Sequence, residues 1–367
     1  VHMSVYIFLW VAVVVFGFIA SRSNYKAKYF VLFSFFLMTI VLGLRGATVG
    51  EDTKMYLNIA ERVTNISWKE VFSSFPTSQW RYISYGGLSG FSEQTETVYL
   101  AYCKLIMLIF HNAQAVLLIT AAITNALFAK FILDNITVKQ DAILAVYIYM
   151  CDAMFMNSFN TMRQILAISI AVQSIELIKK EKYKKAIACV LLAACFHQSA
   201  IVFFVADLFY LLKKKKERYI YLLVTLCALP VLIPVAIKVV SIFSSKYASY
   251  LSVSFWGAQL RGTLLLWIII AIVLFIMIRA NQSDNIDWWL IYMATIYIGV
   301  ELVGMQLTVI SRVAMYFRIF LVLLFPIAQK YFTKKSGQFY KIGVVMLMTV
   351  SFFSYASSPD RLYTFCF

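Results

Sequence analysis

Several arginines of this chain lie at or inside long apolar runs, where a charged side chain is costly. Arg163 opens the apolar run that continues to Ile178, and Arg318 falls within another. An arginine at the middle of a membrane helix costs roughly 2.5–3.5 kcal/mol on insertion scales, so it is expected to face a polar cavity or a partner. Guanidinium groups bind phosphate through two parallel hydrogen bonds. These positions therefore predict a buried site for an anionic ligand.

Two carboxylates follow another arginine at the end of an apolar run. Arg45 is succeeded by two glycines, which allow a tight turn, and then by Glu51 and Asp52, where a helix is expected to begin. An acidic residue at a helix start is ordinarily a cap, and that interpretation stays open. Beside a bound phosphate, Asp52 would be the first choice for the base that takes a proton from an acceptor hydroxyl, and Glu51 the third.

A histidine marks a polar interruption of a further apolar run. His197 is followed by Gln198 and Ser199 in the middle of the stretch 186–212. A lone buried histidine is more often a hydrogen-bonded core residue. Beside other polar groups at a helix break, however, it could act as a base near neutral pH or donate to an oxygen. His197 is the second choice for the base.

The last candidate segment contains two arginines. Arg312 and Tyr316 are expected on one helix face, with Arg318 deeper in the same apolar run. A structural salt bridge with Glu301 of the preceding run is the alternative to phosphate binding here. For Arg163 the alternative is an interfacial arginine whose charge extends to the headgroups.

The composition places these segments in a membrane. Of the 367 residues, 62% are hydrophobic and 14% charged, with a mean hydropathy of +0.81, whereas soluble domains are about half apolar and a quarter charged. Apolar runs that could cross a bilayer recur along the chain, without the alternation of a membrane barrel. The sequence therefore predicts an all-α polytopic membrane protein. Its net charge of +16 comes from basic residues clustered in short loops and does not indicate nucleic-acid binding.

About 10–13 transmembrane or re-entrant helices are expected. The candidate segments are about 4–20, 29–44, 97–110, 114–133, 141–157, 163–178, 186–212, 219–242, 262–279, 288–305, 313–329 and 340–356. Strongly basic connectors at 22–28, 179–185, 213–218 and 330–341 are assigned to the cytoplasm, which leaves 45–96 outside.

Counting crossings under this assignment gives two exceptions. Residue 96 is outside and residue 179 inside, so the chain must cross the membrane an odd number of times between them. Four candidate segments lie there, and the shortest, 97–110, is therefore expected to be a re-entrant or interfacial helix. An even number between 185 and 213 makes 186–212 a hairpin of two half-helices hinged at the polar break, unless one basic loop departs from the rule.

One integral-membrane helical domain over 1–367 is expected. Within it, 45–96 would be a periplasmic loop with short helices, whose aromatic residues suit either sugar stacking or the membrane interface. Val1 and His2, before Met3, look like a remnant of expression.

No metal or other cofactor is expected. The six cysteines form no C-x-x-C pair, and His2, His111 and His197 lack the spacing of metal ligands. The sequence contains no G-x-x-x-x-G-K, G-x-S-x-G or H-E-x-x-H motif, which disfavours ATP-driven transport.

Three segments in order resemble the EpsG family of bacterial polysaccharide proteins, the Wzy-type O-antigen and exopolysaccharide polymerases. They are L-R-G-x-x-V-G-x-D-T-x-x-Y at Leu44–Tyr56, R-Q-x-L-A at Arg163–Ala167 and F-H-x-S-A at Phe196–Ala200. Glu96, with Tyr99 and Tyr102, is a looser match, and Glu51 stands where the family usually has threonine.

The resemblance implies a glycosyltransferase of GT-C-like architecture in the bacterial inner membrane, which polymerises undecaprenyl-pyrophosphate-linked repeat units at the periplasmic face. Its partners would be the lipid-linked donor and acceptor glycans, membrane lipids, a chain-length regulator and a flippase. The expected pyrophosphate-binding residues are Arg45, Arg163, Arg312 and Arg318. The expected substrate-binding residues are Lys54, Tyr56, Glu96, Gln164, Gln198, Ser199 and Tyr316.

Other activities stay open. A GT-C transferase or ligase that uses another polyprenyl-linked donor would often need a metal. A lipid-glycan flippase would carry out no chemistry, and inverted repeats or a charged central path would favour it. A membrane O-acyltransferase needs a histidine near a polar channel, and His197 alone is compatible with one.

Overall fold

The computed structural model describes residues 3–73, 77–83, 90–212, 260–279, 287–304 and 308–366. Its contacts divide the chain into two compact units. The first unit contains residues 1–134, 155–201 and 352–367, and the second contains 135–154 and 202–351. The predicted segment 219–242 lies outside the described residues. The expectation of a single membrane domain stays a prediction.

The first unit contains the site described below. Its elements are α1 (Ser4–Arg22), α2 (Ala27–Gly43), α3 (Thr53–Val63), α4 (Trp68–Val71), β1 (Thr77–Ile83), β2 (Gly90–Glu96), α5 (Thr97–Phe110), α6 (Ala113–Asn135), α9 (Met162–Ala171), α10 (Gln173–Lys179), α11 (Tyr183–Phe196) and η3 (Pro359–Arg361). The short α8 (Ala153–Asn157), η1 (Gln198–Val202) and α19 (Lys334–Ala356) extend across the boundary between units.

The second unit is helical throughout its described part. Its elements are α7 (Lys139–Cys151), α12 (Phe203–Leu212), α15 (Leu260–Arg279), α16 (Trp288–Gly304), α17 (Thr308–Arg318), α18 (Leu321–Ala328) and η2 (Gln329–Tyr331).

Several helices have the length and composition of membrane spans. Among the described residues α1, α6 and α19 are long and apolar enough to cross a bilayer, and the α17–α18 pair, bent by 42°, would form a fourth span. In α1 the buried residues Tyr6, Leu9, Val13 and Gly17 recur every three to four positions and form one face. The remaining surface of α1 is exposed and apolar, which suits lipid. The protein is an all-α polytopic membrane protein, as predicted.

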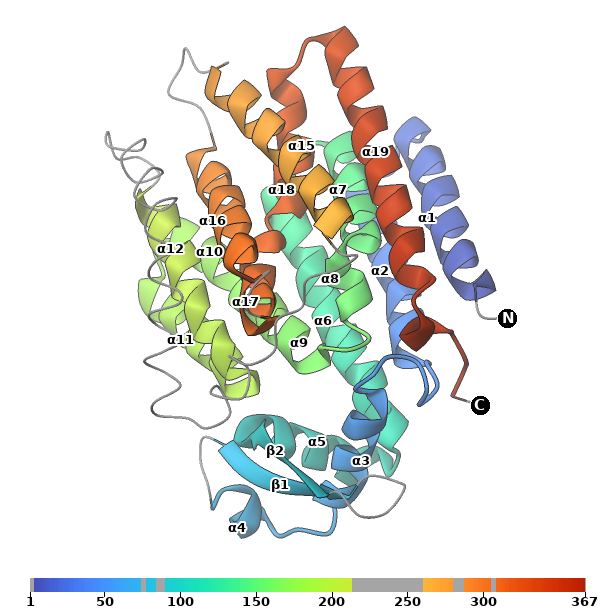
Figure 1. Ribbon diagram of the computed structural model, residues 1–367, viewed down its shortest axis with the longest axis vertical. Helices are drawn as coiled ribbons and strands as arrows, with labels where there is room; N and C mark the ends of the chain where they lie inside the picture. The colour runs from blue at the N-terminus through green and yellow to red at the C-terminus, as the bar shows by residue number, and fades with distance from the viewer. Residues whose placement is uncertain are drawn as a thin grey trace. The chain divides into compact units, whose positions relative to one another are not determined.

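The polar segment 45–96 contains more than the predicted short helices. Helices α3 and α4 are present, but β1 and β2 also pair as an antiparallel hairpin in which Thr77 lies opposite Glu96. The β-branched and aromatic residues of Thr77–Ile83 explain this strand, because such residues favour extended backbone. Figure 1 shows α3, α4, the hairpin and α5 gathered beside one another. The hairpin ends at Glu96, which is also the residue before α5.

Four of the predicted apolar segments are interrupted. The break at His197 was predicted and is confirmed: α11 ends at Phe196, and the backbone of His197 is extended. Whether 186–212 forms a membrane hairpin stays a prediction. The breaks at Asp152, at Val172 and after Arg318 were not predicted. Two of these lie at charged residues, which can bond the backbone groups that a broken helix leaves unpaired.

Candidate functional site

The turn between α2 and α3 contains the first predicted arginine. Gly50 has a φ of +85°, a backbone conformation that favours glycine. Gly46 is constrained by space, since a Cβ there would lie 2.3 Å from the Thr364 hydroxyl oxygen. The two glycines therefore allow this turn, here called the corner (residues 44–52), to pack tightly against the residues around it.

Arg45 is buried beneath the corner, at 1% exposure. Its Nε donates to the Thr53 hydroxyl at 3.0 Å, its Nη1 to the Leu42 carbonyl at 2.6 Å and its Nη2 to the Met162 sulfur at 3.8 Å. Leu42 belongs to the last turn of α2, whose carbonyls carry partial negative charge and stabilise a cation. Burial lowers the pKa of Arg45 to about 10, which leaves the guanidinium protonated at neutral pH.

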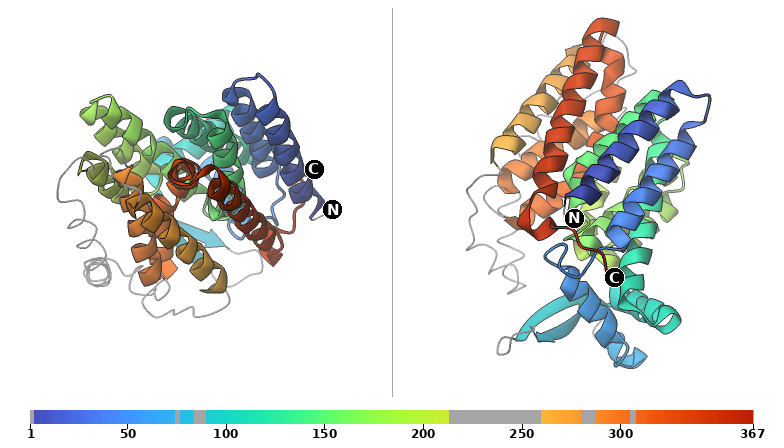
Figure 2. Two further views of the ribbon diagram at one scale, coloured as in Figure 1. Left: turned by 90° about the horizontal axis from the view of Figure 1, so that it is seen from above. Right: turned by 90° about the vertical axis from the view of Figure 1, so that its right-hand side faces the viewer.

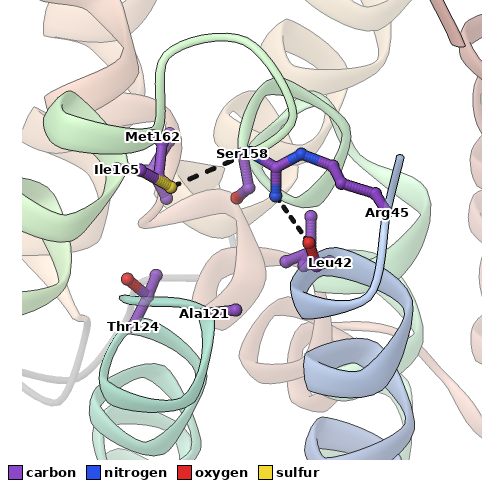
Figure 3. Close-up of a pocket in the computed structure, with 7 residues that line it drawn as sticks. All are labelled: Leu42, Arg45, Ala121, Thr124, Ser158, Met162 and Ile165. Carbon is purple, nitrogen blue, oxygen red and sulfur yellow. Dashed lines mark hydrogen bonds between the residues drawn. The ribbon is translucent and has the colours of Figure 1, made fainter. Parts of the chain in front are cut away.

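A small cavity lies beside this guanidinium (Figure 3). It is lined by Leu42, Arg45, Ala121, Thr124, Ser158, Met162 and Ile165. Most of its wall is apolar, and it has room for roughly one water molecule. In this conformation Arg45 therefore holds the end of α2 to the corner, and its surroundings leave no space for a diphosphate.

The first unit brings three other predicted residues together around Glu96. Arg163, in the first turn of α9, places its Nη1 2.6 Å from Glu96 Oε2. His197, at the break after α11, places its Nδ1 3.1 Å from Glu96 Oε1. The backbone N–H of Gln198 also donates to Oε1, at 3.3 Å. The carboxylate thus shares its two oxygens between an arginine of α9 and a histidine at the break after α11.

The electrostatics of this cluster keep Glu96 ionised. Burial alone would raise the pKa of Glu96, but the contact with His197 and the charge of Arg163 lower it from 4.5 to about 2. His197 Nδ1 lies 3.1 Å from Glu96 Oε1 without the alignment of a hydrogen bond. The side chains of Glu96 and Arg163 are 9% and 12% exposed, while His197 is 28% exposed. His197 is therefore the member of the cluster that a ligand can reach most easily.

Aromatic rings surround the arginine of this cluster. Arg163 Cζ lies 6.0 Å from the ring centre of Tyr56 and 5.6 Å from that of Tyr99. The Tyr99 hydroxyl is buried and lies within hydrogen-bond reach of the Cys103 thiol.

The remaining predicted residues of the first unit lie around this cluster. Asp52 precedes α3 without capping it through its side chain, and its charge acts on Tyr56, one turn along. Glu51 and Lys54 are exposed, Gln164 is buried behind Arg163, and Ser199 is partly buried in η1.

In the second unit Arg318 forms a closed ion pair. Its Nε and Nη2 bond both oxygens of Asp152 at 2.6–3.1 Å, and Asp152 is 1% exposed. The carboxylate that bonds Arg318 is Asp152, not the Glu301 of the alternative, although the charge of Arg318 also acts on Glu301. Arg312 is exposed on α17, and Tyr316 is fully buried.

Three residues that matter here were not predicted. Asp152 is the partner of Arg318. Asn160 bonds the corner through its side chain, accepting from the Glu51 N–H at 3.2 Å. Lys104 is 5% exposed and donates to the carbonyls of Val63, the last residue of α3, and of Ile66, at 3.0 and 2.5 Å. A charge inside an apolar run was the signal that could have identified Asp152 and Lys104.

No metal-ligand cluster is found within the described ranges: no three His, Cys, Asp or Glu side chains lie together there. The expectation that no metal is required stays a prediction.

Comparison with known proteins completes this picture. The model of the EpsG family matches residues 28–367, which includes the corner, the Glu96 cluster and both ion pairs. No curated protein and no solved structure matches the chain. With nearly the whole chain matched, the protein belongs to the EpsG family, a polysaccharide polymerase family.

Proposed function

We propose that this protein joins oligosaccharide repeat units carried on undecaprenyl pyrophosphate, at the periplasmic face of a bacterial inner membrane. The observation that carries the proposal is the Glu96 carboxylate held between Arg163 and the partly exposed His197. A transfer from a lipid diphosphate needs a base for the acceptor alcohol and a fixed positive charge for the leaving group. This cluster contains one of each.

In the proposed reaction His197 is the base. A modest rotation of its ring brings Nδ1–H onto Glu96, which leaves Nε2 to accept the proton of the acceptor hydroxyl. The hydroxyl oxygen then bonds the anomeric carbon of the donor sugar, and the bond from that carbon to the diphosphate oxygen breaks. Glu96 stabilises the imidazolium that forms, as a carboxylate beside a catalytic histidine does.

Arg163 acts on the leaving group. Negative charge grows on the lipid diphosphate as the bond breaks, and Arg163 is the cation bonded to the same carboxylate as the base. Fixed charge aimed at such a developing anion lowers the barrier. A diphosphate contact by Arg312, which is exposed in the second unit, stays a prediction.

Asp52 is the competing candidate for the base, because its charge acts on Tyr56, whose ring lies against Arg163. Replacing each residue separately distinguishes the two. If His197 is the base, Asp52→Asn retains polymer formation and His197→Gln does not. The opposite result would transfer the role to Asp52.

The direct test is a reaction of purified protein with a lipid-linked repeat unit, analysed as a ladder on a gel. The proposal expects a ladder from the wild type, none from Arg163→Met, and a normal one from the control Arg22→Met at the end of α1, where the arginine contacts the Phe18 ring. A wild type that moves the lipid-linked unit across vesicles without lengthening it would be a flippase, and the proposal would fail.

A further inference from the structure

The segment Pro359–Cys366 lies along the corner, far from it in sequence. The N–H groups of Gly46 and Gly50 donate to the carbonyls of Thr364 and Asp360, at 2.7 and 2.6 Å. The N–H of Cys366 donates to the Leu44 carbonyl at 3.0 Å. These bonds satisfy backbone groups of the corner that no helix or sheet pairs. Figure 2 shows this last stretch of the chain running beside the segment between α2 and α3.

Asn160 connects this segment to the corner and to Tyr56. Its Oδ1 accepts from the Glu51 N–H at 3.2 Å, and its Nδ2 donates to Asp360 Oδ2 at 3.0 Å. Its backbone carbonyl accepts from the Tyr56 hydroxyl at 3.1 Å. This single residue in the turn before α9 therefore bonds the corner, α3 and η3 at once.

These contacts determine where the chemical groups of the corner lie. Asp52 sits between Glu51 and α3, and the ring of Tyr56 lies 6.0 Å from Arg163 Cζ. Arg163 follows Asn160 by three residues in the same turn of chain. The side chain of Asn160 is bonded to the corner, and its backbone leads directly into Arg163. A displacement of this side chain would therefore move the corner relative to Arg163.

We propose that Asn160 and Asp360 are positioning residues, which form a clamp that fixes the Glu51–Tyr56 stretch against the Arg163 cluster. The clamp acts through the backbone of the corner and touches no substrate. This inference rests on the proposed function for its effect on rate, but the contacts of the clamp can be tested without it.

The activity test uses the direction of one hydrogen bond. Asn160→Asp keeps the oxygen that accepts from Glu51 but sets a second carboxylate against Asp360, so polymer formation should fall about tenfold or more. Asp360→Asn keeps an oxygen that can accept from Asn160 but removes the charge beside the buried Arg361, whose Nε lies 3.5 Å from Asp360 Oδ2, so the double variant is compared with this single variant. The double variant restores a donor and an acceptor and should recover most of the rate. The loss should be in kcat with KM for the donor unchanged, since Arg163 is intact.

Two results of the rate measurements would overturn the clamp. One is an Asn160→Asp variant as active as the wild type; the other is a double variant no better than Asn160→Asp. Unfolding midpoints of all four proteins are measured alongside. A loss of rate that follows the midpoint in every variant would also overturn it, because a purely structural role gives that result.

A cross-link tests the geometry without any activity. The hydroxyls of Thr48 and Thr364 are 3.1 Å apart, so Thr48→Cys with Thr364→Cys, in a Cys366→Ser background, should form a disulfide found by peptide mass spectrometry. The cross-linked protein should polymerise like its reduced form. No cross-link, or a cross-linked protein that is inactive until reduced, would overturn the clamp. If the wild type forms no polymer, the proposed function is wrong, but the cross-link still tests whether the clamp has this geometry.

Discussion

Each unit contains an arginine bonded to a buried carboxylate, yet the two pairs differ in what they leave accessible. Arg318 occupies both oxygens of Asp152, and Asp152 is 1% exposed. Glu96 gives only one oxygen to Arg163 and turns the other toward His197, which is 28% exposed. A buried charge in a membrane protein thus does not by itself indicate a site. The proposed function rests instead on a carboxylate that an arginine shares with a partly exposed histidine.

The strongest test of this comparison replaces each pair by apolar residues of similar size. Such replacement is often neutral for stability. Glu96→Leu with Arg163→Met should reduce polymer formation by about a thousandfold or more, since both charge and base orientation are lost. Asp152→Leu with Arg318→Met should retain activity within about tenfold of the wild type. The rate of ladder formation measures both, and an equal loss in the second double variant would place Arg318 in the site.

The next prediction concerns His197 alone. His197→Gln should lower the polymerisation rate about 10²–10⁴-fold, the usual contribution of a general base, while the unfolding midpoint stays unchanged because the side chain is partly exposed. His111→Gln, an exposed histidine at the end of α5, is the matched control and should behave like the wild type. Unimpaired polymer formation by His197→Gln would remove it as the base.

Removing only one partner of the Asp152–Arg318 pair should lower the stability of the protein. Asp152→Leu alone leaves Arg318 buried without its carboxylate and should lower the free energy of unfolding by about 3–5 kcal/mol. Adding Arg318→Met should recover most of that loss. Denaturant unfolding in detergent measures the cycle. A single variant as stable as the wild type would mean that the pair is not closed in solution.

The Glu96–Arg163 pair should make the stability of the protein depend on pH under acidic conditions. Because the pKa of Glu96 is about 2 when folded against 4.5 in its ordinary state, the stability from this group is complete above about 4.5. It is lost as pH falls toward 2, and at most about 3 kcal/mol is involved. Unfolding of the wild type and of Glu96→Gln followed from pH 6 to 3 should converge on acidification. A constant difference would contradict the shifted pKa.

The sequence predicted where helices end better than it predicted which charged side chains bond one another. The helix ends near Gly43 and Phe196 follow from local signals, and the break at His197 follows from polar residues inside an apolar run. That Arg163 would bond Glu96, 67 positions away, and that Arg318 would bond Asp152, 166 away, depends on packing that residue types alone do not specify.

Arg45 was predicted to bind a ligand, and the structure buries it, which shows the same limit of prediction from sequence. Its position at the end of a span resembles that of Arg163, and both were expected to bind a diphosphate. The structure bonds Arg45 to a helix-end carbonyl, a hydroxyl and a sulfur under a corner that excludes solvent. Burial depends on the surrounding chain, so sequence spacing could not separate the two arginines.

The clamp has a consequence for biosynthesis. Thr48 meets Thr364 across 316 positions of sequence, so the amides of the corner acquire their acceptors only after nearly all the helices have been made. During translation the helices can enter the membrane one after another while this part of the site is still open. Until residues 359–366 have been added, the N–H groups of Gly46 and Gly50 lack the carbonyls of Thr364 and Asp360, and the corner cannot take the form described above.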